Sequence, residues 1–427
     1  MPGSVELTAG TGSSVVVERC QVCDDPDLRP ILFLGYLPPV NQMRPIGARP
    51  HEQPAYPALL LHCRRCQLVQ LGLTVDPNIL FPPEYPYTSG TTRILRENFA
   101  QLYRECQTVI PPAKDDLIVD IGSNDGTLLS NFQVGGHRVH GIEPTDMSQL
   151  ARQRGINTTQ AFFDRDSAQK VRTEEGPAKI ITATNVFAHI ENVHDMVESL
   201  LGLLDAKGVF ISESHYLMSL IETLQYDTIY HEHLRYYSLG SLQYLLEMHG
   251  LEIIHARRIP THGGSIRVYA ARRGTYTVPT SVGIMLEEEK AAALHTEKLK
   301  AFKQRVVVAK LKLYRLLWEI KKRGEKIYGI GAPSRASTMI NYVGLDDGII
   351  DCVLEIKGSY KIGKFMPGTL IPVLEEAKLY GDPPDYALLF SWHIAEELMP
   401  KLVAQGYRGK FIVPLPEPRI VGSENFT

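Results

Sequence analysis

The stretch from Leu117 to Gly126 constrains the fold of this 427-residue chain more than any other part of the sequence. Residues 117–121 form an apolar run with β-branched side chains, which is typical of a strand buried in a parallel sheet. The loop that follows lies between two glycines, which permit positive φ angles and a close approach of a ligand to the backbone. A second strand-like run, 138–142, ends on Glu143. This order predicts a parallel α/β sheet with a ligand beyond the carboxyl ends of its strands.

The acid at position 143 and the composition of the loop indicate which ligand this is. An acidic side chain at the end of the second strand can accept both ribose hydroxyls of an adenosine. The loop differs from GxGxxG and has no lysine followed by serine or threonine for phosphate and magnesium, so a nucleoside without phosphates is favoured. We therefore predict S-adenosylmethionine (SAM) as the cofactor. The predicted cofactor-binding residues of this region are Asp120, Gly122, Ser123, Asn124, Gly126 and Glu143.

Four of the six cysteines form two CxxC pairs, Cys20 with Cys23 and Cys63 with Cys66. Two such pairs separated by a loop are typical of a zinc ribbon, because tetrahedral Zn²⁺ takes four thiolates from two turns of the chain. A closed site of four cysteines leaves no open coordination position, so we expect this zinc to support folding and not catalysis. His62 would serve as a ligand only in place of one of these cysteines.

The remaining patterns divide the chain into three domains. Strand-like and helix-like runs alternate after the cysteine region, which predicts a doubly wound sheet closed by a hairpin over 251–271. One long helical pattern covers 287–323, and a second strand, glycine loop and helix begin at Lys326. We predict a zinc-binding module over 1–80, a SAM-binding domain over 81–272 and a Rossmann-like domain over 273–427. The fold class is α/β.

The densest cluster of ionisable side chains, 226–237, follows the fifth predicted strand. Tyr230, Glu232 and His233 can all carry protons, and they stand within four residues of one another. The HEH sequence lacks the HExxH spacing that places two imidazoles on one helical face, so a catalytic metal is not favoured. Ionisable groups beside a cofactor pocket point instead to acid–base chemistry.

Six sequence features occur here in one order: the four-cysteine module, the loop 120–126, and the segments 185–189, 230–233, 262–267 and 329–333. Together they resemble the family of SAM-dependent C-methyltransferases that act on nucleotide-linked deoxysugars. The resemblance covers nearly the whole chain. It implies a nucleotide-sugar substrate, often a dTDP-linked 4-keto-6-deoxyhexose methylated at C-3, and a C-terminal domain that helps to hold it. It also implies deoxysugar and antibiotic biosynthesis. One departure is the segment 355–364, where an Asp-Asn-Pro-x-Lys run is expected, and this leaves the nucleotide and the sugar open.

The resemblance adds Asn185 to the cofactor-binding residues. It also implies that Tyr87, on a proline-rich aromatic loop, covers the sulfonium or the sugar. Gly329, Gly331 and Arg335 lie on a loop at a helix start, where backbone N–H groups favour phosphate. The predicted substrate-binding residues are Tyr87, His262, Arg267, Gly329, Gly331 and Arg335.

C-methylation beside a ketone requires a base, because a sugar carbon becomes nucleophilic only after it loses a proton. A histidine suits this role, which is typically worth ~10²–10⁴ in rate. We predict His233 as the base, and Glu232 as a group that orients it or a substrate hydroxyl. Tyr230 and His189 would donate hydrogen bonds to the developing enolate.

Composition narrows the alternatives. The chain is 44% hydrophobic and 22% charged with a net charge of −3, so a broad basic surface for nucleic acid is not indicated. No apolar run approaches the ~20 residues that span a bilayer, and we expect a cytoplasmic protein without membrane partners. The oligomeric state is left open, and a monomer is compatible with the sequence. The rival functions are an O- or N-methyltransferase and a zinc-ribbon protein that binds nucleic acid.

Overall fold

The computed structural model describes residues 14–49, 53–81, 90 and 93–426. Its central domain is built on a mostly parallel sheet in the order β12-β13-β10-β9-β6-β7-β8. The strands are β6 (Leu117–Ile121), β7 (Arg138–Ile142), β8 (Thr158–Thr159), β9 (Ala178–Thr184), β10 (Leu204–His215), β12 (Leu251–Ile259) and β13 (Ser265–Arg272). β13 pairs antiparallel with both β10 and β12, which closes one end of the sheet with the expected hairpin.

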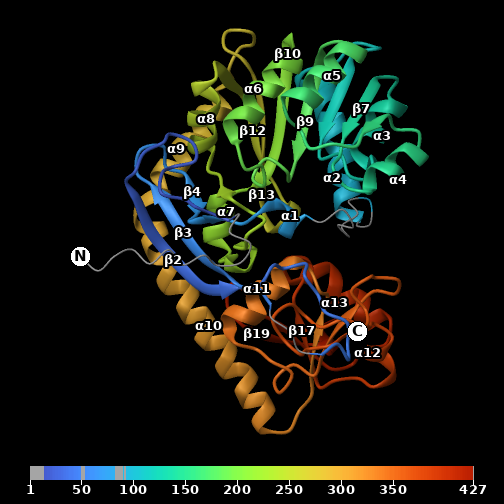
Figure 1. Ribbon diagram of the computed structural model, residues 1–427. Helices are drawn as coiled ribbons and strands as arrows, with labels where there is room; N and C mark the ends of the chain where they lie inside the picture. The colour runs from blue at the N-terminus through green and yellow to red at the C-terminus, as the bar shows by residue number, and fades with distance from the viewer. Residues whose placement is uncertain (1–13, 50–52, 82–89, 91–92, 427) are drawn as a thin grey trace.

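Helices cover both faces of this sheet, as Figure 1 shows. They are α2 (Arg93–Val109), α3 (Thr127–Val134), α4 (Met147–Gln153), α5 (Arg165–Glu175), α6 (Val193–Leu203) and α8 (Leu239–Met248). The chain runs outward from β6 to β8 and returns to β9 on the other side of β6. The order therefore reverses between β6 and β9, and ligands of doubly wound sheets bind at such a point.

The N-terminal region forms a second, antiparallel sheet in the order β11-β4-β3-β2. Its strands are β2 (Leu28–Leu37), β3 (Tyr56–Cys63), β4 (Val69–Leu71) and β11 (Arg235–Tyr236). β11 belongs to the segment 226–237, so the zinc module (residues 1–80) pairs directly with the chain that carries the ionisable cluster.

The C-terminal domain has a third sheet, in the order β16-β15-β14-β17-β18-β19. Its strands are β14 (Ile327–Ile330), β15 (Cys352–Glu355), β16 (Val373–Glu375), β17 (Tyr386–Leu389), β18 (Lys410–Val413) and β19 (Arg419–Gly422), and its helices include α11 (Ser334–Val343) and α13 (Ala395–Ala404). All its neighbouring strands are parallel except β18 and β19, as a Rossmann-like domain requires.

The prediction of one helix over 287–323 is wrong. The structure has α9 (Thr280–Ala291), a π-helical turn (Leu294–Lys298) and α10 (Leu299–Lys322). The break lies at Ala293, which has a φ of 48°. It buries Leu294 and stacks His295 on His62 of the zinc module at 5.5 Å, so tertiary packing overrides helix propensity here.

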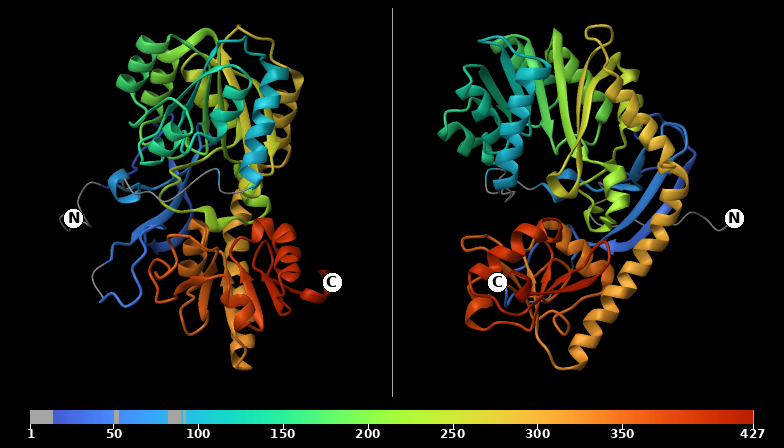
Figure 2. Two further views of the ribbon diagram at one scale, coloured as in Figure 1. Left: turned by 90° about the vertical axis from the view of Figure 1, so that its right-hand side faces the viewer. Right: turned by 180° about the vertical axis from the view of Figure 1, so that it is seen from behind.

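Figure 1 shows how α10 joins the parts: this long helix runs from beside the zinc module down the side of the C-terminal domain, and the right view of Figure 2 shows the same course from behind. The zinc module lies at the junction of the other two domains and contacts both. In the part of the chain that the structure describes, no helix is both long and apolar enough to cross a bilayer.

Candidate active site

The four predicted zinc ligands come together in the structure. The sulfur atoms of Cys20, Cys23, Cys63 and Cys66 all lie within 4.8 Å of one another, and all four side chains are buried. The Cys20–Cys66 and Cys23–Cys63 sulfur pairs are each 3.4 Å apart. Tetrahedral Zn–S bonds of 2.3 Å imply sulfur separations of about 3.8 Å, so the cluster fits one zinc ion. His62 is not part of this group, because its Nε2 pairs with Gln67 at 3.1 Å.

Glu143 lies at the carboxyl end of β7 and lines a large cavity. One carboxylate oxygen accepts the backbone N–H of Asn124 at 2.9 Å. The other accepts the backbone N–H and the hydroxyl of Thr145 at 2.9 and 2.6 Å. A carboxylate has about four acceptor positions, so these bonds leave room for about one more. Glu143 is therefore held in place, with about one acceptor position left for a ligand; that this ligand is the ribose stays a prediction.

Of the predicted cofactor-binding residues in the glycine loop, Gly122 and Asn124 line the cavity. Gly122 has a φ of +67°, and a Cβ there would lie 2.5 Å from Val186, so only glycine fits. A Cβ on Gly126 would lie 2.9 Å from Ile156, which makes this glycine a packing requirement beneath α3. Neither Gly126 nor Ser123 lines the cavity.

Asp120 is also buried away from the cavity lining, which corrects its assignment as a direct cofactor ligand. Its carboxyl group accepts the Thr182 hydroxyl at 2.6 Å and so fastens β6 to β9. Burial raises the pKa of Asp120 to about 8. Asn185, in contrast, lines the cavity, and its side-chain oxygen is buried without a hydrogen-bond partner among the described residues. An unsatisfied acceptor at this edge of the sheet fits a bound ligand.

The predicted catalytic residues meet around His233. Its ring lies 4.2 Å from that of Tyr230 and 4.9 Å from that of His189, measured between centroids. His215, at the end of β10, lies 4.8 Å away and extends the cluster to His262, which is 5.5 Å from His215. All five residues line the cavity and come from four separate parts of the chain.

One hydrogen bond fixes the protonation of His233. Its Nδ1 lies 2.7 Å from the carbonyl oxygen of Thr228, and only a protonated nitrogen can donate to a carbonyl. The neutral ring then has its lone pair on Nε2. Burial, reinforced by the neighbouring His189, lowers the pKa of His233 well below its usual value, so the ring is neutral at pH 7. His233 thus has the form that a general base requires.

The other histidines are also neutral. Burial lowers the pKa of His189 and of His262 to about 4, and it lowers that of His215 well below its usual value. Neutral rings donate hydrogen bonds without adding positive charge to the site. Over the described ranges of the chain, the only group of three or more residues that could hold a metal is the cysteine cluster, so the histidines do not form a second one.

Arg335 lines the cavity, but its guanidinium is already paired. Its Nε and Nη2 donate to the two carboxylate oxygens of Asp227 at 2.9 and 3.0 Å, and Nη2 also donates to Gln225 at 3.0 Å. Trp392 donates its indole N–H to Asp227 at 2.7 Å. Asp227 neutralises the guanidinium charge, and the pair fastens the C-terminal domain to the catalytic segment (residues 226–237). We predicted Arg335 as a substrate-binding residue; it lines the cavity, and its contact with the substrate stays a prediction.

Gly329 and Gly331 do not line the cavity. A Cβ on Gly329 would lie 2.4 Å from Phe390, and Gly331 has a φ of +79°. Both glycines are therefore explained by close packing and backbone conformation. The cavity is lined instead by the next residues of the same loop, Pro333 and Ser334.

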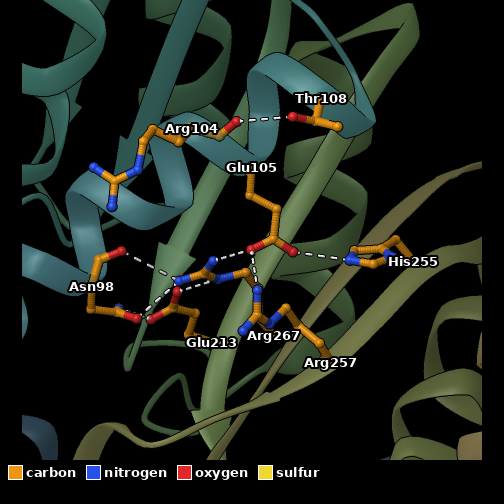
Figure 3. A network of polar contacts seen from close by, with 8 residues as sticks. All are labelled: Asn98, Arg104, Glu105, Thr108, Glu213, His255, Arg257 and Arg267. Carbon is orange, nitrogen blue, oxygen red and sulfur yellow. Dashed lines mark hydrogen bonds and ion pairs between the residues drawn. The ribbon is translucent and has the colours of Figure 1, made fainter.

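Arg267 is also misassigned as a substrate ligand. Figure 3 shows its side chain, which comes from β13, beside Glu213 of β10 and Asn98 and Glu105 of α2. The Arg267 side chain is fully buried. Nε donates to Glu213 at 2.6 Å, Nη1 to Glu105 at 2.5 Å and Nη2 to the side chain of Asn98 at 2.9 Å. It does not line the cavity. A buried arginine between two carboxylates holds the wall of the domain together.

Several residues that line the cavity were not predicted as site residues. Asn41 comes from the zinc module, and Tyr360 and Lys361 come from the departure segment 355–364. The Lys361 ammonium donates to the Ala332 carbonyl at 2.5 Å, and burial lowers the pKa of Lys361. The departure of segment 355–364 from the family pattern was the one sequence feature that pointed to Tyr360 and Lys361. Tyr87 lies outside the described residues.

The cavity has a volume of about 2050 Å³, and residues of all three domains line it. Typical ligand sites occupy ~300–1,000 Å³, so there is room for two ligands side by side. Gly122 and Glu143 of the SAM-binding domain line it, as do Ser334, Lys361 and His393 of the C-terminal domain and the histidine cluster.

Comparison with known proteins decides the family. The chain is 31% identical over 415 residues to the C-methyltransferase NovU of Streptomyces niveus, covering 96% of this chain and 98% of NovU. The chain belongs to the C-methyltransferase family. Residues 20–81 match a zinc binding domain, 93–256 a methyltransferase domain and 260–416 the C-methyltransferase C-terminal domain. It is a SAM-dependent C-methyltransferase with a zinc-binding module.

The solved structures that resemble this chain, one methyltransferase among them, match only part of it. The magnesium protoporphyrin IX methyltransferase of Synechocystis PCC 6803 with bound SAM is 16% identical and covers 42% of this chain and 77% of its own, with a TM-score of 0.31. The PH0226 protein of Pyrococcus horikoshii OT3 is 13% identical and covers 47% and 97%, with a TM-score of 0.35.

Proposed function

We propose that this C-methyltransferase transfers a methyl group from SAM to C-3 of a dTDP-linked 4-keto-6-deoxyhexose. The observation that carries the proposal is the state of His233: a buried neutral imidazole whose protonated Nδ1 is held by Thr228. A base of this kind is needed to methylate a carbon beside a carbonyl and is not needed to methylate an amine. The size of the cavity and its lining by the C-terminal domain support a second, large ligand such as a nucleotide sugar.

Each residue around His233 has its own role in the proposed reaction. His233 Nε2 removes the proton from C-3, and the electron pair of that bond moves to the 4-keto oxygen. Tyr230 and the neutral His189 donate hydrogen bonds to this enolate oxygen, which stabilises it most when its charge is greatest. SAM supplies an electrophilic methyl group when bound. The carbanion form of C-3 would bond to that methyl group as the sulfur–methyl bond breaks, which would leave S-adenosylhomocysteine. His233 then returns its proton to water.

Of the two roles that we expected for Glu232, orienting the base or orienting a substrate hydroxyl, the contacts of His233 favour the second. The Nδ1 of His233 is held by Thr228 and not by Glu232, so Glu232 does not orient the base through that nitrogen. It lines the cavity near the domain junction, where we propose that it binds a hydroxyl of the sugar.

A substrate panel tests this proposal. The protein is incubated with SAM and a set of dTDP-, UDP- and GDP-linked 4-keto-6-deoxyhexoses, together with amine and hydroxyl acceptors. We expect the mass of one added methyl group on a dTDP 4-ketosugar, located at C-3 by NMR. Methylation at an oxygen or a nitrogen, or of acceptors that lack a ketone, would overturn it.

A further inference from the structure

We propose that the zinc module contributes a positioning residue to the active site, Asn41, which acts through Glu232. This inference rests on the proposed function, in which Glu232 contacts the sugar. Asn41 follows β2 and lines the cavity. Its side-chain Nδ2 lies 2.7 Å from Oε1 of Glu232, 191 residues further along the chain.

The orientation of the Asn41 amide follows from its two partners. An ionised carboxylate can only accept hydrogen bonds, so the amide nitrogen must face Glu232. The amide oxygen then accepts the hydroxyl of Ser334, at 3.4 Å, from the start of α11. One side chain thus joins the zinc module, the catalytic segment and the C-terminal domain at the wall of the cavity.

The backbone on both sides of this bond is held by the same small sheet. β2 leads into Asn41, and β11, which follows His233, pairs with β4 of that sheet. The Leu71 N–H donates to the carbonyl of Leu234 at 2.9 Å, and the ring of His231 contacts the Pro57 carbonyl at 3.3 Å. The zinc-stabilised sheet therefore fixes the position of Glu232 in two ways. The pairing of β11 with β4 fixes the backbone near Glu232, and Asn41 fixes its side chain.

The effect of the Asn41 hydrogen bond depends on the negative charge of Glu232. A neutral donor at 2.7 Å stabilises the carboxylate and fixes one of its oxygens, so that the group meets the substrate in one orientation. Asn41→Asp has nearly the same shape but replaces the donor with a second carboxyl group. Two carboxyl groups at this distance share one proton, which raises the pKa of the pair. Lys361 and Tyr360 of the C-terminal domain also interact with Glu232, and the Lys361 ammonium opposes this rise in the pKa without removing the second carboxyl group.

The sign of the effect follows from linkage. The folded Asn41→Asp protein binds the shared proton more tightly than the unfolded chain does. The hydrogen bond that the shared proton forms between the two carboxyl groups therefore stabilises the fold at low pH. This stabilisation is lost as the pH rises through the raised pKa of the pair. A substitution that only disturbed packing would have the same effect at every pH.

Thermal stability tests this without any turnover. Melting temperatures of the full chain are compared at about pH 6 and about pH 8.5 for wild type, Asn41→Asp and Gln42→Glu, the last adding the same charge at the exposed neighbouring position. We expect the melting temperature of Asn41→Asp to lie below that of wild type, and this difference should be larger by roughly 2–4 °C at the higher pH. Gln42→Glu should show no such increase, and Glu232→Gln should abolish it in the Asn41→Asp protein. An equal difference at both pH values overturns the proposal.

Two further measurements complete the test. If Asn41→Asp does not fold, a double-mutant cycle of Asn41→Ala with Glu232→Gln replaces it, and additive effects on the melting temperature overturn the contact. In the methylation assay, kcat of Asn41→Asp should fall at least tenfold relative to wild type between the two pH values, with SAM affinity unchanged; a parallel pH profile contradicts positioning. Failure of wild type to methylate any ketosugar would count against the proposed function, while the melting data would still decide the Asn41 contact.

Discussion

Replacing Glu143 with Ala should weaken SAM binding by an amount that the structure bounds. Three protein donors already occupy its carboxylate, two from Thr145 and one from Asn124, which leaves about one position for a ribose hydroxyl. A hydrogen bond to a charged group contributes about 1.5–3 kcal/mol, which corresponds to roughly 10–150-fold in Kd. Two strong ribose bonds would give about twice that free energy.

Isothermal titration calorimetry with SAM measures this directly. Thr145→Val is the matched control, because it removes a donor to Glu143 and leaves the carboxylate in place. We expect its Kd to stay within about threefold of wild type, since only the support of the carboxylate weakens. Glu143→Gln, which keeps one acceptor oxygen, should fall between the control and Glu143→Ala. A Kd for Glu143→Ala within twofold of wild type would refute the placement of the ribose at Glu143.

Three further predictions concern the zinc, the domain junction and the base. Cys63→Ser should lower bound zinc and soluble yield together, measured by metal analysis; full zinc content in the variant would contradict the cluster. Arg335→Ala removes the cation paired with the buried Asp227 carboxylate, which keeps the hydrogen bond from Trp392, and should lower the free energy of unfolding by about 3–5 kcal/mol in a denaturant titration, without changing SAM affinity. Because burial holds the pKa of His233 well below 6.5, kcat/KM should be flat above pH 6.5 and fall only at lower pH, as the base becomes protonated; a fall centred at or above pH 6.5 would contradict this.

The features that were predicted from sequence are those encoded in short stretches. The strand before Gly122, the acid at Glu143 and the paired cysteines each carry their signal within a few residues, and the structure places them as expected. Tyr230 and His233 were predicted as catalytic residues for the same reason, since one local run contains both; both line the cavity, and their roles stay predictions.

What local patterns could not reveal depends on partners far away in the chain. Arg267 and Arg335 stand in conspicuous motifs, but Glu213 and Asp227 pair with them from other elements, and no local pattern reveals such pairs. Asn41 and His215 are single residues without a motif, and only the fold brings them to the cavity. The helix break at Ala293 lies among good helix formers, so propensity alone predicted continuity.

Proton exchange at C-3 tests the central claim, that His233 generates the carbanion, apart from methyl transfer. Wild type is incubated in D₂O with a dTDP 4-ketosugar and S-adenosylhomocysteine, which has no methyl group to transfer, and deuterium at C-3 is followed by NMR. Wild type should incorporate deuterium, His233→Ala should lose exchange and turnover together while both ligands still bind by calorimetry, and Glu232→Gln should slow exchange less. Exchange by His233→Ala at the wild-type rate would contradict the account and place the base elsewhere.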